Sequence, residues 1–248
     1  MQLYIIRHAQ STNNARWLET RSSLGRDEDP GLTEIGKKQA QILGEFLSRS
    51  SSINPLHEHD PRNQAGFDLT HLYCSLMLRS VQTGTELAKA TGLPLEGWVE
   101  LHETGGMITG DGETEPYRGI PGRPRSYFEE NYPDLILPDG VDENGWWNRP
   151  FEGEEERPLR AQRVIQRLIT RHGRSTDRIA IVIHGAFSNY LLRGLIGLTE
   201  NAPLWFDLSN ASITRVDFIK DRDQPENIFR VIFYMNRLDF MPNELITP

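Results

Sequence analysis

Cysteine is almost absent from this chain of 248 residues, which contains only Cys74. A single thiol excludes an intramolecular disulfide and a zinc site made of cysteines alone. Long apolar runs are missing too, and none approaches the length that crosses a bilayer. The first eight residues, Met1 to His8, lack the basic leader and apolar core of a signal peptide. We therefore expect a cytoplasmic protein that does not enter membranes.

Basic residues are outnumbered, since 27 Lys and Arg stand against 35 Asp and Glu, for a formal net charge of -8. This balance argues against general binding of nucleic acid or anionic membranes, although it leaves room for a local basic pocket. Glycine-rich phosphate loops are also absent, because neither GxGxxG nor GxxxxGK[ST] occurs. Nucleoside-triphosphate chemistry therefore has no support.

Short apolar runs alternate with amphipathic segments along the chain. The expected strands are Leu3–Ile6, His71–Cys74, Ile179–Ile183, the weaker Trp98–Leu101, and the late runs Ser212–Ile219 and Phe229–Tyr234. The expected helices are Thr33–Leu47, Arg79–Ala90, Pro158–His172 and Ala186–Leu195. In the first helix Thr33 is a plausible cap, and Ile35, Ile42, Leu43 and Phe46 fall near one face. The alternation predicts an α/β fold, a three-layer α/β/α sandwich around a mostly parallel sheet, as one domain spanning residues 1–248.

Two stretches fit no regular element. Residues 48–66 are polar and read as an exposed loop insertion, in which His57-Glu58-His59-Asp60 is more simply a solvated run than a metal site. Residues 105–157 are rich in Gly, Pro and aromatic residues and read as an ordered lid with a short helix at Ser126–Tyr132. There Trp146 and Trp147 favour packing, while Arg123, Arg125 and Arg149 could reach a second anionic group on a substrate.

Reactive side chains follow the predicted strands, at the sheet edge where α/β proteins bind ligands. Arg7 and His8 follow the first strand, Arg79 the second, Glu103 the Trp98 run, and His184-Gly185-Ala186 the Ile179 strand. An Arg fork matches the oxygens of a phosphate monoester, so Arg7 and Arg79 are natural clamps. A neutral imidazole can attack phosphorus, and the Arg charges should lower its pKa. Glu103 can protonate the leaving alkoxide, and backbone amides after His184 can donate to the phosphate.

These residues sit in five blocks that together carry a family resemblance. They are Leu3–Asn14, Leu32–Ala40, Ser75–Thr83, Leu101–Glu103 and Val182–Gly185. In this order the blocks resemble the histidine phosphatase superfamily, branch 1, with its phosphoglycerate-mutase-like fold. The resemblance implies that His8 is the nucleophile and that Arg7, Arg79 and His184 hold the phosphate.

By the same resemblance Glu103 is the proton donor, and Asn14 and Ser11 are supporting phosphate contacts. No metal or organic cofactor is implied, and the implied partner is a small phosphorylated substrate. Ala9 replaces the usual Gly after the first His, a change that we expect the loop to tolerate. Glu100 and Glu113 remain alternatives to Glu103 as the acid.

The segment Thr104-Gly105-Gly106-Met107 lacks the Arg-Tyr-Gly and Asn-Lys pattern of cofactor-dependent mutases. The sequence therefore favours a metal-independent phosphomonoesterase that works through a phosphohistidine. A phosphoglycerate mutase, a catalytically weak phosphate-dependent binding or scaffold protein, and a phosphoprotein phosphatase stay open. A homodimer formed through the free edge of Phe229–Tyr234 is also open.

Overall fold

A seven-stranded mixed sheet runs through the middle of the computed structural model, which describes residues 1–49, 60–199, 202–221, 224 and 227–248. The strands are β1 (Gln2–Arg7), β2 (His71–Cys74), β3 (Leu95–Gly97), β6 (Leu135–Ile136), β7 (Arg178–Ile183), β8 (Ile213–Lys220) and β9 (Ile228–Arg237). Their order is β6-β3-β2-β7-β1-β8-β9. The first five run parallel, whereas β8 is antiparallel to β1 and β9 to β8.

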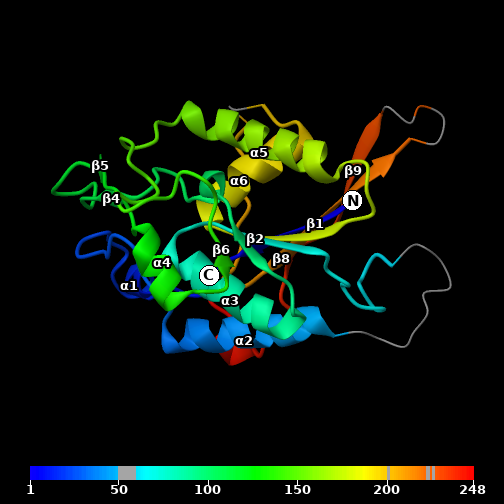
Figure 1. Ribbon diagram of the computed structural model, residues 1–248, viewed down its shortest axis with the longest axis horizontal. Helices are drawn as coiled ribbons and strands as arrows, with labels where there is room; N and C mark the ends of the chain where they lie inside the picture. Colours follow the sequence, from blue (N-terminus) through cyan, green and yellow to red (C-terminus); the bar gives the residue numbers. More distant parts are fainter. Residues whose placement is uncertain (50–59, 200–201, 222–223, 225–226) are drawn as a thin grey trace.

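Helices cover both faces of this sheet. They are α1 (Thr12–Thr20), α2 (Glu34–Ser48), α3 (Leu78–Thr91), α4 (Arg125–Asn131), α5 (Glu156–His172) and α6 (Gly185–Ile196), with short 3₁₀ turns at Val99–Leu101 and Asn243–Leu245. In Figure 1, α2 and α3 lie below the sheet and α5 and α6 above it. The predicted α/β fold with a mostly parallel central sheet is confirmed.

The side chains of β1 point alternately into two hydrophobic cores, one on each face of the sheet. Leu3 and Ile5 pack with the residues under α5 and α6, whereas Tyr4 and Ile6 pack with those under α2 and α3. Successive side chains of a strand point to opposite faces, so a strand covered on both faces reads as a continuous apolar run. Because helices cover both faces, a ligand can approach such a sheet at the edge where the strands end.

Two details of the sequence prediction were wrong. Residues Val99–Leu101 form a 3₁₀ turn, and the strand next to β2 is Leu95–Gly97. Trp98 is nonetheless buried, and its ring lies edge-on to Tyr73, so a short apolar run here marks burial and not a strand. In α2, Ile35 is exposed, whereas the buried side of the helix is formed by Gly36, Gln39, Ala40, Leu43, Gly44 and Leu47.

Residues 105–157 contain little regular structure apart from α4, β6 and a small hairpin of β4 (Ile108–Thr109) and β5 (Arg118–Gly119). Trp146 and Trp147 are buried in the core on the α2 side, as expected of packing residues. Figure 1 shows this segment, in green, at one end of the molecule. The lid role of the segment stays a prediction.

At the opposite margin of the sheet, β9 is the outermost strand, as its sequence predicted. Pairing of this edge in a homodimer stays a prediction. The run His57–His59 lies outside the described residues. Among the residues that the structure does describe, no helix combines the length and apolar character needed to cross a membrane.

Candidate active site

A cavity of about 500 Å³ lies at the carboxyl ends of β1 and β7. The predicted site residues that line it are Arg7, His8, Ser11, Asn14, Arg79, Glu103, Gly185 and Ala186. His184 stands directly behind it, with its ring centroid 5.1 Å from that of His8. The strands converge because β7 pairs in parallel with both β2 and β1, so their ends bring the following residues to one edge.

The ring of His8 is held in one tautomer. Its Nδ1 lies 2.7 Å from the carbonyl oxygen of Ala9, which can only accept a hydrogen bond. Nδ1 therefore carries the proton, and the lone pair of the neutral ring is on Nε2. The Nε of Arg79 donates to that same Nε2 at 3.1 Å. This unprotonated nitrogen thus lies beside a cation that can bind phosphate oxygens.

The position of Ala9 also explains why a methyl group is accepted there. The described residues with a positive φ do not include Ala9, so no glycine-only backbone conformation is required. Its amide donates to Thr83 Oγ1 at 3.1 Å, and that hydroxyl donates to the carbonyl of Arg79. Thr83 therefore joins the loop that contains His8 and Ala9 to the first turn of α3, which contains Arg79.

Burial keeps the central histidines neutral. His8 is 2% exposed and His184 is 0% exposed. Burial, followed by the charges of Arg79 and Arg7, lowers the pKa of His8 well below 6.5. The pKa of His184 is lowered in the same way, by burial first and then by the charge of Arg79. At neutral pH the ring of His8 is therefore uncharged.

Two buried nitrogens at the site have no hydrogen-bond partner within the described chain. They are Nε of Arg7 and Nδ1 of His184. The other contacts of these side chains hold them in place, because Arg7 Nη1 donates to the carbonyl of Leu208 and His184 Nε2 shares a hydrogen bond with Ser75 Oγ. A buried polar group without a partner is costly, so both nitrogens fit the role of donors that await an anion.

Glu103 caps helix α6. Its carboxylate accepts hydrogen bonds from the backbone amides of Phe187 at 2.8 Å and Ala186 at 3.1 Å. The N-terminus of α6, whose dipole favours an anion, is therefore occupied by the carboxylate of Glu103 and not left open for a phosphate. The amide of Ala186 can reach a phosphate only when Glu103 turns away, and its phosphate role stays a prediction.

The structure distinguishes Glu103 from Glu100 and Glu113, the two alternatives for the acid. Glu100 forms ion pairs with Arg163 and Arg167 on α5. Glu113 accepts hydrogen bonds from Ser22 and Ser23 on the loop after α1. Neither lines the cavity, whereas Glu103 does.

Ser11 and Asn14 form a capping box at the start of α1. The Ser11 hydroxyl accepts a hydrogen bond from the backbone amide of Asn14 and donates one to the side-chain oxygen Oδ1 of Asn14. Asn210 Nδ2 also donates to Asn14 Oδ1, at 3.3 Å, and to the His8 carbonyl at 3.1 Å. The Ser11 hydroxyl and Asn14 Oδ1 are both engaged in the cap. The side-chain nitrogen Nδ2 of Asn14 is therefore the better candidate for a phosphate contact.

Sequence reasoning missed several residues at this site. Ser75 belongs to the third block of the family resemblance, which implies no role for it, and Asn210 lies in an irregular stretch that offers no periodic signal. The cavity is also lined by Trp17, Arg21, Arg26, Trp205 and Asp207, none of which follows a predicted strand directly.

The arginines that were considered for a second anion lie elsewhere. Arg123 pairs with Asp29, and Arg125 pairs with Glu129. Arg149 lies over the ring of Trp147. None of the three lines the cavity.

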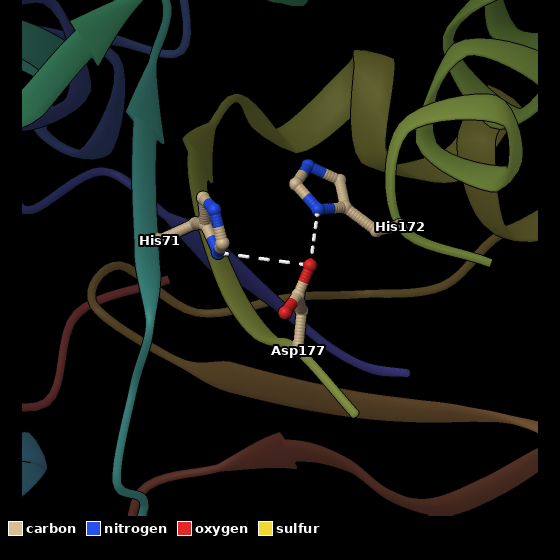
Figure 2. A group of neighbouring side chains, drawn as sticks. All are labelled: His71, His172 and Asp177. Carbon is tan, nitrogen blue, oxygen red and sulfur yellow. Dashed lines mark hydrogen bonds and ion pairs between the residues drawn. The ribbon is translucent and has the colours of Figure 1, made fainter. Parts of the chain in front are cut away.

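One group of potential metal ligands gathers within the described residues, namely His71, His172 and Asp177 (Figure 2). It lies where β2 and β7 begin, at the sheet edge opposite His8. His172 is satisfied by protein partners, since Nδ1 bonds Asp177 at 2.7 Å and Nε2 contacts the Tyr73 hydroxyl at 3.1 Å. His71 Nδ1 is 4.0 Å from Asp177 and 2.9 Å from Thr70 Oγ1. We interpret the group as a hydrogen-bonded network that holds α5 to the sheet.

Comparison with known proteins now decides the family. The model of the histidine phosphatase superfamily (branch 1) matches residues 3–55 and 61–229. The chain belongs to this family. The chain is also 26% identical, over 228 residues, to a probable phosphoglycerate mutase GpmB of Yersinia pestis (strain Pestoides F), covering 88% of this chain and 85% of that protein.

Solved structures show the same fold at lower identity. A mycobacterial glucosyl-3-phosphoglycerate phosphatase in complex with VO3 has a TM-score of 0.58 at 19% identity, covering 95% of this chain and 98% of that chain. A phosphoserine phosphatase from Entamoeba histolytica in complex with 3-phosphoglyceric acid gives 0.59 at 16%, covering 97% and 99%. An alpha-ribazole phosphatase from Shigella flexneri gives 0.58 at 21%, covering 96% of each chain.

Proposed function

We propose that this histidine phosphatase is a metal-independent phosphomonoesterase that hydrolyses a small phosphorylated metabolite through a phosphohistidine on His8. The observation that carries the proposal is the fixed tautomer of a buried, neutral His8. Its Nε2 lone pair lies beside Arg79 in a cavity that Arg7 and Glu103 also line.

The first step transfers the phosphoryl group to His8. The substrate phosphate binds between Arg7, Arg79 and Nδ1 of His184, whose donors match its oxygens. Arg79 Nε then shifts its hydrogen bond from His8 Nε2 to a phosphate oxygen, which frees the Nε2 lone pair. Nε2 attacks phosphorus while the bond from phosphorus to the leaving oxygen breaks. Glu103, which takes up a proton from solvent when the dianionic substrate binds and then turns away from the α6 amides, gives that proton to the leaving oxygen, and the alcohol departs. The imidazole gains positive charge, which its Nδ1–H shares with the Ala9 carbonyl.

The second step hydrolyses the phosphohistidine and regenerates the free enzyme. Water enters from the side that the alcohol has left and attacks phosphorus, and Glu103 takes its proton. The bond between phosphorus and Nε2 breaks, which restores the neutral ring and releases inorganic phosphate. The clamps that stabilise charge in the first transition state serve equally in the second.

Hydrolysis of p-nitrophenyl phosphate in the presence of EDTA tests this proposal. We expect the wild type to be active under these conditions and His8→Ala to lose about 10³-fold or more in kcat, as expected when a covalent nucleophile is removed. Arg174→Gln is a control, because Arg174 is exposed in the turn between α5 and β7. Equal activity of wild type and His8→Ala would remove His8 from the mechanism.

A phosphoglycerate mutase is the second candidate, and the GpmB relative is the observation that favours it. Mutase chemistry needs the phosphohistidine to survive until the phosphoryl group is handed back to a rearranged substrate. Incubation of 3-phosphoglycerate with a bisphosphoglycerate primer distinguishes the two reactions. We expect release of inorganic phosphate and no 2-phosphoglycerate; the reverse result would make the protein a mutase.

A further inference from the structure

The cavity is larger than the catalytic set requires. At about 500 Å³ it falls within the size range of pockets that enclose an organic ligand. In the mechanism proposed above, a phosphate would fill only the end of the cavity where His8, Arg7 and Arg79 meet. Most of the remaining lining belongs to two segments that supply no residue to the reaction, namely the end of α1 with the loop after it and residues Trp205–Leu208, and Pro248 completes it.

Two of the five tryptophans stand at this outer part. Trp17 is 48% exposed and Trp205 is 58% exposed, and both line the cavity. Trp98, Trp146 and Trp147 are in contrast 5% exposed or less. An indole ring in water is costly, and its flat face is well suited to stack on another ring. Because both exposed rings border one cavity, they point to a leaving group that carries a ring.

Two arginines of the same outer part have no catalytic assignment. Arg21 ends α1, and Arg26 follows on the next loop. Arg26 Nη1 is shielded from solvent and has no hydrogen-bond partner within the described residues. Its charge also lowers the pKa of Arg79, although burial lowers it more. Arg21 and Arg26 outnumber Asp207, the acidic side chain in this part of the lining, so a positive charge is left over that favours an anion beyond the phosphate.

Both segments are anchored, so the outer part is preformed. Beside Trp205, Asn189 accepts from the Phe206 amide at 2.6 Å and donates to the Phe206 carbonyl at 3.0 Å. Next to Arg26, Asp27 accepts from Thr12 Oγ1 and its amide donates to Asn13 Oδ1. Binding to such a surface costs little ordering entropy.

We propose that Trp17, Arg21, Arg26 and Trp205 form a second subsite that selects phosphomonoesters whose leaving group carries both a ring and its own acidic group. This inference rests on the phosphomonoesterase function proposed above and names the class of its substrate. The acidic group is a carboxylate or a second phosphate, which the arginines recognise through the same charge-assisted hydrogen bonds.

Four synthetic substrates test the subsite. They are propyl phosphate, 3-carboxypropyl phosphate, benzyl phosphate and 4-carboxybenzyl phosphate. All four release a primary alcohol, so the chemistry of bond cleavage is matched while the ring and the carboxylate vary independently. We expect kcat/KM of the wild type to rise about tenfold for the ring and about tenfold for the carboxylate, so that 4-carboxybenzyl phosphate is the best of the four.

The variants assign each preference to its residues. Arg26→Gln should lower kcat/KM for the two carboxylated substrates about tenfold more than for their uncharged partners. Trp205→Leu should lower kcat/KM more for the benzyl substrates than for the propyl ones, and Trp205→Phe should restore most of that difference. Arg174→Gln should leave all four values unchanged.

The outcomes separate this inference from the proposed function. If His8→Ala hydrolyses all four substrates as well as the wild type does, the phosphohistidine mechanism itself is wrong. If hydrolysis depends on His8 but the wild type shows no preference for the ring or the carboxylate, the subsite is wrong. The subsite is equally wrong if Arg26→Gln and Trp205→Leu lower all four values by one common factor.

Discussion

At the scale of single residues, one hydrogen bond decides the chemistry of His8. The Ala9 carbonyl fixes the proton on Nδ1 and leaves the lone pair on Nε2, the proposed nucleophile. The sequence predicted a lowered pKa from the neighbouring arginines, and the structure adds burial as the larger cause. Burial of a strand-end residue depends on the segments that fold over it, which include Asn210 and its partners, and no local pattern announces them.

Glu103 should matter most when the leaving oxygen needs a proton. Glu103→Gln keeps the size and planar shape of the carboxyl group and one acceptor oxygen for the Phe187 amide, but it removes the acidic proton. We therefore expect kcat to fall about 10²- to 10³-fold for an alkyl phosphate and much less for p-nitrophenyl phosphate, whose leaving phenolate is stable without a proton. Parallel assays of both substrates check this prediction.

Asp207 provides the matched control for that comparison. It is the other carboxylate that lines the cavity, and its charge raises the pKa of Arg7, which burial lowers more strongly. Asp207→Asn should show no dependence on the leaving group. An equal loss for both substrates in Glu103→Gln would remove Glu103 as the acid.

At the scale of elements, the helices that the sequence predicted are those that bury an apolar side. Helix α1 was missed because none of its residues is buried, so it has no apolar periodicity to detect. Its only local signal is the capping box of Ser11 and Asn14, in which Asn takes the place of the usual Glu or Gln. This unrecognised helix carries Trp17, which explains why the outer part of the cavity could not be predicted.

Helix α5 holds the segment around Glu103 through a buried ion pair. Arg160 Nη2 and Nε donate to the two carboxylate oxygens of Glu152, at 2.8 and 2.5 Å. Arg160 Nη1 also donates to the carbonyls of Glu100 and His102, on the approach to Glu103. Glu152 in turn exchanges backbone and side-chain hydrogen bonds with Gly105. The pair therefore fixes the chain on both sides of Glu103.

Removing one charge of this pair should be costly. Glu152→Gln leaves Arg160, which is 2% exposed, without its counter-charge. We expect the free energy of unfolding to fall by about 3 kcal/mol, the usual loss for half of a buried ion pair. Urea unfolding measures this, with the exposed Glu154→Gln expected within about 0.5 kcal/mol of wild type. Equal stability of the two variants would show that the pair does not stabilise the fold.

At the scale of the whole molecule, the order of strands could be anticipated only in part. The apolar runs identified β1, β2, β7, β8 and β9, and the rule that ligands lie beyond strand ends brought His8, Arg79 and His184 to one edge. The placement of β6 at the far end of the sheet was not predicted, because a two-residue strand leaves no pattern. Long-range pairing of this kind is decided by tertiary packing.

Three buried histidines tie the stability of the fold to pH. Burial is the largest cause that lowers the pKa of His8, His102 and His184 well below 6.5. The unfolded chain binds a proton at each below about pH 6.5 while the folded chain does not, so stability falls as pH decreases below that value. Each histidine contributes at most about 1.4 kcal/mol per pH unit.

Urea unfolding between pH 7.5 and 5 measures this dependence. His102→Gln removes one of the three groups without touching the proposed nucleophile, and the free energy of unfolding should then fall less steeply with acid than in the wild type. Identical slopes in the two proteins would show that His102 is not held neutral by the fold.

The proposed mechanism depends above all on His8 Nε2 carrying the phosphoryl group during turnover, and rapid quench with a ³²P-labelled substrate is the decisive experiment. We predict a phosphoenzyme that forms within one turnover, is stable to base and labile to acid, and maps by mass spectrometry to the peptide that contains His8. Full turnover without such a species, or label on any other residue, would contradict this mechanism.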